Sequence, residues 1–134
     1  MTLSAKHISV SINLDPKTVY EFTSAPLNMP KWASGLSESI KKENDHWIAH
    51  SPMGEVTIKF SSPNEWGVID HDVTLENGKT FHNPLRVLKN GKGAEVVFTL
   101  YRQPEMNEDD FNRDANMVQA DLIKLKKILE STLE

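Results

Sequence analysis

The sequence predicts an α+β domain in which a curved antiparallel sheet of about seven strands wraps around one long C-terminal helix, with two short helices after the first strand. Three observations carry this prediction. A long amphipathic segment closes the chain, strand-length segments joined by tight turns fill its middle, and an alternating strand followed by a helix-start signal opens it. The chain has 134 residues, of which 38% are hydrophobic and 25% are charged. This size and composition are typical of one folded domain, so we expect residues 1–134 to form a single domain.

The first strand and the short helices are predicted from residues 8–32. β-branched residues alternate with polar ones across residues 8–12, which is the period of a half-buried strand. Asp15 then suits the N-cap position, and Pro16 suits the first helical position because the N–H that proline lacks would be unpaired there. Two further prolines allow at most a second short helix, which we expect to end near Trp32.

The middle of the chain is predicted to be a succession of strands. Asn77-Gly78 and Asn90-Gly91 are typical of type I′ hairpin turns, in which both central residues take a positive φ. Tight turns between consecutive strands predict antiparallel neighbours, and long strands predict a strongly twisted and curved sheet. The predicted strands cover residues 36–43, 45–51, 54–61, 66–76, 79–89 and 93–103.

The clearest element is the helix predicted from Asn107 to about Leu133. Asn107 suits the N-cap position, and three acidic residues follow it in the first turn, where they complement the helix dipole. At 1.5 Å per residue such a helix spans about 40 Å. Its apolar stripe must be buried, and the sheet is the only large partner in the predicted order of elements. The stripe consists of Phe111, Ala115, Val118, Leu122, Leu125 and Leu129.

Composition and charge exclude several classes of function. The sequence contains no cysteine, which excludes disulfides, thiol catalysis and cysteine-ligated metals. The net charge of −4 gives no general attraction to phosphate backbones, so no nucleic-acid partner is expected. No apolar run approaches the roughly 20 residues of a membrane span, so none is expected. No signal peptide is visible, and we therefore expect a cytoplasmic protein.

Four segments carry a resemblance to a known family. They are INLDPKTVYEFTSAPLNMPKW (residues 12–32), GVIDHDVTLENG (67–78), RVLKNGKGAEVVFTLYRQPEM (86–106) and FNRD (111–114). Together they resemble the START-like, Bet v 1-like superfamily, also called the SRPBCC or polyketide cyclase/dehydrase group, and in particular its small stand-alone bacterial members. The resemblance covers nearly the whole chain and implies the helix-grip fold. The superfamily spans lipid carriers, aromatase/cyclases, hormone receptors and chaperone regulators, so the fold does not settle the function.

The resemblance also implies a cavity between the concave face of the sheet and the long helix, suited to a small hydrophobic molecule. Periodicity by itself shows only that the inner face is apolar. Each residue expected at the cavity therefore has a simpler alternative, which is ordinary packing in the core. The predicted ligand-binding residues are Met29, Trp32, Ile58, Phe60, Ile69, His71, Val73, Phe98, Leu100, Phe111, Asp114, Val118 and Leu122.

His71 is the candidate catalytic residue. Strand alternation places it on the same face as Ile69 and Val73, toward the apolar interior, where burial disfavours its charged form. There it would act as a general acid or base, or hydrogen-bond a ligand carbonyl or hydroxyl; the alternative is a neutral core histidine. Asp114 and Asp121 lie seven residues apart near the apolar stripe. One of them would orient the imidazole, unless both are flanking carboxylates that pair with neighbouring cations.

The other polar candidates give weaker signals. His46 and His50 have the spacing of a zinc site on a helix, but on a strand they are about 13 Å apart and cannot share a metal, so no metal site is expected. Pro84 marks an edge or a bulge, and a bulge would turn His82 or Arg86 inward. Arg86 would then bind a carboxylate or enolate oxygen; otherwise it is a solvated edge residue. The remaining possible site residues are Arg86 and, at the rim, Tyr101.

Three functions are compatible with the sequence. The first is binding of a small hydrophobic molecule in the cavity. The second is an enzyme of the cyclase, aromatase or dehydratase kind that uses His71 as its acid or base, and the third is regulation of a partner protein. Aldol-type steps run on positioning and proton transfer, so no cofactor is expected. We expect a monomer or, through the edge near Pro84, a homodimer.

Overall fold

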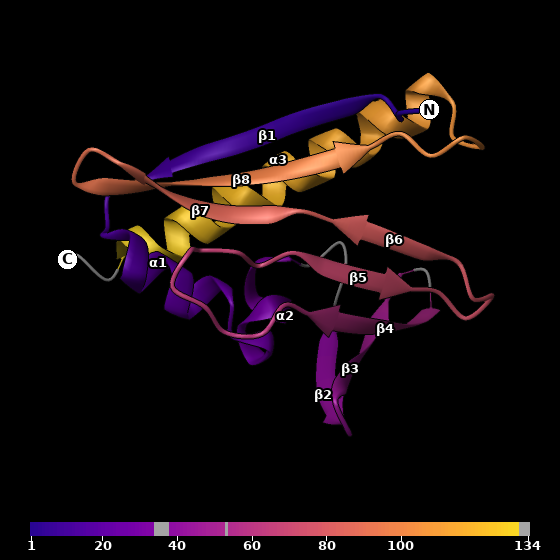
Figure 1. Cartoon of the computed structure of the whole chain (residues 1–134), viewed down its shortest axis with the longest axis horizontal. Coiled ribbons are helices and arrows are strands. Elements are labelled where there is room, and N and C mark those ends of the chain that lie inside the picture. Colours follow the sequence, from indigo (N-terminus) through magenta and orange to yellow (C-terminus); the bar gives the residue numbers. More distant parts are fainter. Residues whose placement is uncertain (34–37, 53, 132–134) are drawn as a thin grey trace.

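A computed structural model describes residues 1–33, 38–52 and 54–131 of the chain. The chain begins with a strand, passes through three short helical segments, and then runs from strand to strand until the long C-terminal helix, as Figure 1 shows. The helical elements are α1 (Pro16–Thr23), the 3-10 segment η1 (Pro26–Asn28), α2 (Met29–Trp32) and α3 (Glu108–Glu130). The strands are β1 (Ala5–Ile12), β2 (Ser39–Glu43), β3 (His46–Ser51), β4 (Gly54–Phe60), β5 (His71–Thr74), β6 (Thr80–Asn83), β7 (Leu85–Asn90) and β8 (Gly93–Tyr101).

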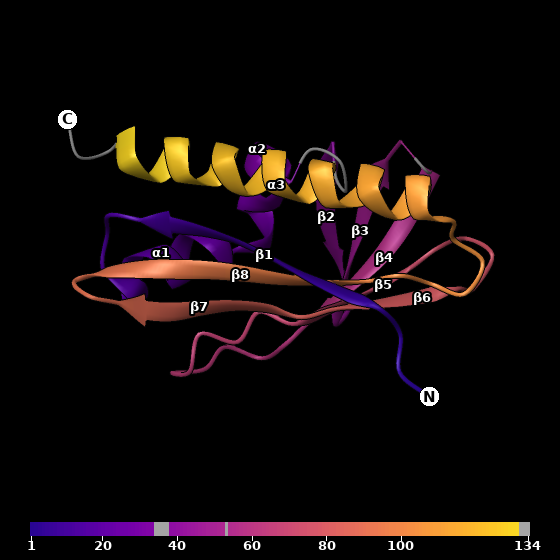
Figure 2. The same cartoon turned by 90° about the horizontal axis from the view of Figure 1, so that it is seen from above.

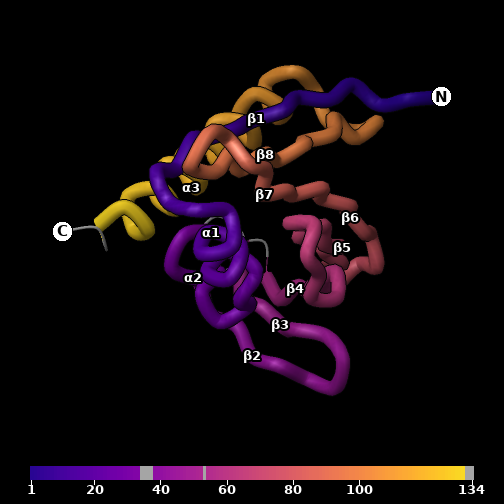
Figure 3. The backbone as a smooth tube through the Cα atoms, turned by 60° about the vertical axis from the view of Figure 1, so that its left-hand side comes forward, coloured from indigo at the N-terminus to yellow at the C-terminus, as the bar shows by residue number. Residues whose placement is uncertain are grey.

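The strands form a curved antiparallel layer, as predicted. They pair in the orders β2-β3-β4-β5-β6 and β1-β8-β7. The two groups adjoin because β6 and β7 are separated only by Pro84, whose carbonyl accepts a hydrogen bond from the Thr99 N–H of β8 at 3.0 Å. Figure 3 shows the strands following an open curve from β1 round to β2. This curve creates the concave side on which the site lies.

Two predicted strands differ from the observed ones. The predicted strand 79–89 is divided at Pro84, so the described residues form eight strands rather than about seven. Proline has no N–H for the ladder, and the chain changes partner there, since β6 pairs with β5 whereas β7 pairs with β8. The predicted strand 66–76 shrinks to β5 because Asn64 ties down the segment before it. The Asn64 side chain accepts from the Val68 N–H at 3.1 Å and donates to the Val68 carbonyl at 2.9 Å.

Both glycine turns join antiparallel strands as predicted, but the predicted turn type was wrong. A type I′ turn needs a positive φ at both central residues. Neither Asn77 nor Asn90 has one; the positive values are 89° at Gly78 and 59° at Gly91. Asn90 is the last paired residue of β7, so Gly91 and Lys92 are the central residues of that turn. A positive φ at the first of them alone is the requirement of a type II′ turn.

The long helix α3 lies across one side of the sheet (Figure 2), which confirms the main expectation from the sequence. Its start is confirmed too, since the Asn107 side chain accepts from the Asp110 N–H at 2.8 Å. The predicted end near Leu133 lies outside the described residues. Val118, in the middle of the stripe, is only half-buried, because it faces the cavity described below. Buried residues of α3 are Phe111, Leu122, Leu125 and Leu129.

The short helices close one end of the sheet. The predicted cap of α1 is confirmed, since the Asp15 side chain accepts from the Thr18 N–H at 3.1 Å. The Tyr20 hydroxyl accepts from the backbone N–H of Asn64 at 3.1 Å, so α1 is tied to the loop before β5. α2 buries its Trp32 side chain and packs against α3. No helix within the described ranges is both long and apolar enough to cross a membrane.

Candidate functional site

A cavity of about 390 Å³ lies between α3 and the concave side of the sheet. Its walls come from α2, β5, β6, β8, α3 and the segment between β8 and α3, and most of its lining residues are apolar. The volume falls within the range of roughly 300–1,000 Å³ that is typical of small-molecule sites. The predicted site residues that line it are Met29, Trp32, His71, Val73, Phe98, Leu100, Tyr101, Asp114, Val118 and Leu122.

Four residues predicted at the cavity belong to the surrounding core. Ile58 and Ile69 are almost fully buried among other core side chains. Phe60 packs its ring against the ring of His71, with centroids 5.6 Å apart, and so supports the site from behind. Phe111 is buried at the N-terminal end of α3. These four residues are packed in the core and do not line the cavity, which is the alternative that the sequence left open.

Arg86 does not turn inward at Pro84. Its guanidinium is exposed and forms a two-pronged contact with Asp70, with Nε and Nη2 at 2.9 and 2.7 Å from the two carboxylate oxygens. This contact holds the pKa of Asp70 below its usual value. His82 lines one edge of the cavity, although its side chain is more than half exposed and its Nδ1 lies 2.7 Å from an oxygen of Asp72. Pro84 therefore divides the strand, but the side chain of Arg86 stays on the outer surface.

Several lining residues were not predicted from the sequence. Met117 shares the helical face of Asp114 and Asp121, so the helical period was a sufficient signal for it. Phe81 lies on β6, whose direction depends on the break in the strand. Gln103 and Met106 lie between β8 and α3, where no periodic signal exists. The lining residues outside the predicted ligand-binding set are Ala33, Pro52, Phe81, His82, Asn83, Gln103, Met106, Met117 and Asp121. Of these, Asp121 was expected as a partner of His71, and His82 as a residue that a bulge would turn inward.

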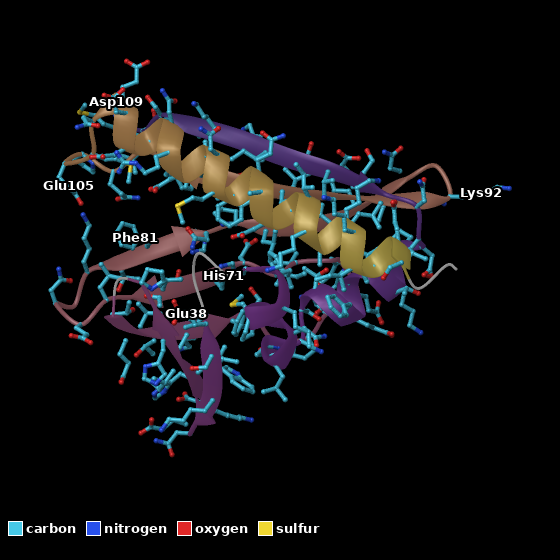
Figure 4. The ribbon with its side chains drawn as sticks, turned by 180° about the vertical axis from the view of Figure 1, so that it is seen from behind. Glu38, His71, Phe81, Lys92, Glu105 and Asp109 are labelled. Carbon is cyan, nitrogen blue, oxygen red and sulfur yellow. The ribbon has the colours of Figure 1, made fainter. Side chains whose placement is uncertain are left out.

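His71 presents one hydrogen-bond acceptor to the cavity. The residue is 3% exposed, and its Nδ1 lies 2.9 Å from the backbone carbonyl oxygen of Ile69. A carbonyl only accepts, so Nδ1 carries the proton. Burial lowers the pKa of His71 and keeps the ring neutral, so Nε2 retains its lone pair. The described residues supply no hydrogen-bond partner for Nε2. In the view of Figure 4, His71 and Phe81 lie below the N-terminal half of α3.

The orienting partner of His71 is therefore the Ile69 carbonyl and not a carboxylate of α3. Asp114 and Asp121 both line the cavity, but neither has a hydrogen bond or ion pair with the imidazole. The expectation that one of them holds the ring in place was wrong, because the strand itself supplies an acceptor two residues away. Both carboxylates line the cavity without contacting the imidazole.

Asp114 and Asp121 are unusual because burial is not balanced by a partner. Burial raises the pKa of Asp114, against a weaker opposing effect of Arg113, whose guanidinium pairs with Asp110 at 3.1 Å. Burial also raises the pKa of Asp121 to about 6, and the attraction of Lys124 offsets only part of that effect. Across the described ranges, neither carboxylate has a salt bridge. The expected pairing with neighbouring cations is thus absent there.

Trp32 adds an unpaired hydrogen-bond donor. It lines the cavity from α2, is 4% exposed, and its indole Nε1 has no hydrogen-bond partner among the described residues. A buried donor left unpaired costs about 1–3 kcal/mol. Together with Nε2 of His71, the cavity region therefore contains one free acceptor and one free donor.

The two histidines with zinc-like spacing lie on β3, as expected. His46 begins the strand and His50 is exposed on it. Over the ranges that the structure describes, no group of three or more possible ligands gathers around a metal-sized site. The separation between His46 and His50 is therefore that of residues four apart on a strand, and not that of residues one turn apart on a helix.

Comparisons with known proteins identify the fold. No family model matches the chain, and neither does any curated protein. Among solved structures, the Aha1 dimer from Colwellia psychrerythraea matches with a TM-score of 0.75 at 13% identity, over 96% of this chain and 97% of that chain. The Bet v 1-family protein Ara h 8.0201 matches with a TM-score of 0.66 at 12% identity, over 96% and 99% of the two chains.

A third match has a biosynthetic setting. DynU16, from the dynemicin biosynthetic locus, matches with a TM-score of 0.73 at 12% identity, over 96% of this chain and 48% of that chain. Identities this low show the fold alone. The curved sheet, the long helix and these matches agree with the resemblance seen in the sequence. The chain has the START-like, Bet v 1-like (SRPBCC) fold.

Proposed function

We propose that this protein binds a small, mostly apolar molecule in the cavity between α3 and the sheet. The observation that carries the proposal is the combination of apolar walls with the free Nε2 of His71 in a cavity of about 390 Å³. Burial of apolar ligand surface supplies the affinity, at about 25 cal/mol per Å². One or two polar groups then fix the orientation of the ligand.

The polar groups define what the ligand must offer. Nε2 of His71 accepts, so it selects a ligand hydroxyl or N–H and not a bare carbonyl. The indole N–H of Trp32 is buried without a partner among the described residues, so a ligand acceptor that reaches it would gain a hydrogen bond. The ligand is thus amphiphilic, with an apolar body and at least one hydrogen-bonding group.

A second candidate is an enzyme of the cyclase or dehydratase kind. The geometry of His71 favours it. The residue lines the cavity, the Ile69 carbonyl holds Nδ1–H, and Nε2 is left unprotonated, as a general base requires. We rank it second because burial outweighs the attraction of Asp70 and Asp72 for the protonated ring. A base whose conjugate acid is so poorly stabilised has little driving force for proton abstraction.

Blocking the cavity tests the proposal before any ligand is known. Native mass spectrometry of the purified protein detects a co-purified small molecule, and 1-naphthylmethanol serves as a fluorescent apolar probe with one hydroxyl. We expect the probe to bind the unmodified protein and to be lost from Val118→Trp, which fills the cavity from α3. Ile123→Trp is the matched control, because Ile123 is 42% exposed and lies outside the cavity lining. Equal binding by both variants, or no binding by the unmodified protein, would overturn the proposal.

His71→Ala separates the two candidates. For a binding protein we expect a loss of probe affinity of roughly two- to tenfold, the value of one hydrogen bond, with no turnover of ketone substrates. For an enzyme, the rate falls by orders of magnitude while binding is largely kept. Circular dichroism checks that the variant is folded. Unchanged affinity and unchanged rate would remove His71 from the site.

A further inference from the structure

The charge inside the cavity is of one sign. Among the described lining residues, the side chains with a formal charge are Asp114 and Asp121; no lysine or arginine contributes to the wall. The two aspartates are seven residues apart on α3, which places them two turns apart on the same face, with an axial separation of about 10 Å. A ligand in the cavity therefore meets two carboxylates along one side.

Neither carboxylate is neutralised by the protein. Arg113, the cation beside Asp114, forms its ion pair with Asp110, and Lys124 forms no ion pair with Asp121. Burial raises the pKa of both cavity aspartates, so the fold keeps two carboxyl groups where their ionised forms are disfavoured. A partly buried charge without a partner is disfavoured, and a bound cation would relieve it directly.

Independent polar atoms point to a ligand in the same place. Nε2 of His71 is an unpaired acceptor on a residue that is 97% buried, and Trp32 carries an unpaired buried donor. Aromatic rings of Phe81, Phe98 and Tyr101 also line the space. Aromatic faces attract organic cations as well as apolar groups. The wall is therefore suited to a positive charge attached to an apolar body.

We propose that the natural ligand is an amphiphilic organic amine, bound with its ammonium group against one of the two cavity carboxylates, Asp114 or Asp121, and its apolar body against the aromatic wall. This inference rests on the proposed function and narrows it to one chemical class. A carboxylate or phosphate ligand is disfavoured, because it would lie beside two carboxylates with no lysine or arginine in the described wall. A hydroxyl on the apolar body would donate to Nε2 of His71.

Three probes with the same ring and different charge test the inference. Calorimetric titration compares 1-naphthylmethylamine, 1-naphthylmethanol and 1-naphthylacetate at pH 7.5 and low ionic strength. We expect the amine to bind at least about tenfold more tightly than the alcohol, the value of one charge-assisted hydrogen bond, and the carboxylate to bind most weakly. In the Asp114→Asn/Asp121→Asn double variant, the amine and the alcohol should bind equally.

A control variant separates the effect of the cavity carboxylates from the effect of net charge. The control variant Glu108→Gln/Asp109→Asn removes the same number of charges from the exposed first turn of α3, and should preserve the preference for the amine. If the unmodified protein binds alcohol as tightly as amine, the inference fails while the proposed function stands. If none of the three probes binds, both fail. Loss of the preference in Glu108→Gln/Asp109→Asn would also overturn the inference, because the effect would then be one of net charge alone.

Discussion

Replacing Asp121 with asparagine should stabilise the protein at neutral pH. Burial raises the pKa of Asp121 from 3.8 to about 6, so the folded state holds its proton more tightly than the unfolded chain does. A carboxyl of this kind favours folding while it is protonated, and that contribution is lost as the pH rises through the folded pKa. The folded protein is thus weakened progressively between about pH 4 and 6, and the full penalty remains above that range.

The size of the effect follows from the two pKa values. A fully shielded carboxyl with this difference would cost the folded state about 3 kcal/mol at neutral pH. Asp121 is only partly buried, and solvent screening reduces the penalty to about 1–2 kcal/mol. In a domain of this length, that gain corresponds to a rise in melting temperature of roughly 3–8 °C.

Urea unfolding at pH 7.5 and at pH 4 measures this effect. Asp121→Asn should be more stable than the unmodified protein at pH 7.5, and the difference should nearly vanish at pH 4. Asp109→Asn, in the exposed first turn of α3, should show no gain, because its carboxylate complements the helix dipole. Equal stability at pH 7.5 would refute the reasoning about burial. A gain of the same size at both pH values would assign the effect to packing and not to charge.

Three further outcomes are expected from unfolding measurements. Asn107→Ala should lose about 1 kcal/mol by removing the cap of α3, whereas Asn116→Ala, exposed within the same helix, should be neutral or slightly stabilising; equal effects would contradict the capping argument. Arg86→Met should lose about 1 kcal/mol at pH 7, and the loss should disappear as the pH falls through the depressed pKa of Asp70; a loss that persists at pH 2 would exclude the ion pair as its cause. Trp32→Phe removes an unpaired buried N–H and should leave stability unchanged or higher, so a loss above about 3 kcal/mol would show that the indole nitrogen has a partner in the folded protein.

Much of the fold could be predicted because local signals and the global arrangement agree. Asn107 marks the start of α3, and the apolar stripe that follows at helical spacing has no partner except the sheet. Asp15 marks the start of α1 in the same way. Alternation correctly placed His71 on the inner face of its strand. These features depend on residues within a few positions of one another, so a single sequence carries them in full.

The remainder depends on contacts between distant residues. The loop before β5 is held in place by α1, because the backbone N–H of Asn64 donates to the Tyr20 hydroxyl, 44 residues away. Arg86 pairs with Asp70 on the segment that lies beside β7, a pairing that spacing along the chain does not indicate. The lining contributed by Met106 comes from a segment without periodicity. Such features are decided by how the sheet curves, which the pattern of side chains specifies only in outline.

The hydrogen bond between Nδ1 of His71 and the Ile69 carbonyl joins two residues of one short stretch of chain. Its geometry moves with that stretch and needs nothing from the helix on the opposite wall. If α3 moves when a ligand binds, the imidazole keeps its tautomer and its orientation. Reorganising this group then adds nothing to the free-energy cost of binding. If the protein binds a ligand as proposed, the hydrogen bond to Nε2 of His71 is preorganised, and any adjustment to the shape of the ligand comes from the wall residues on α3.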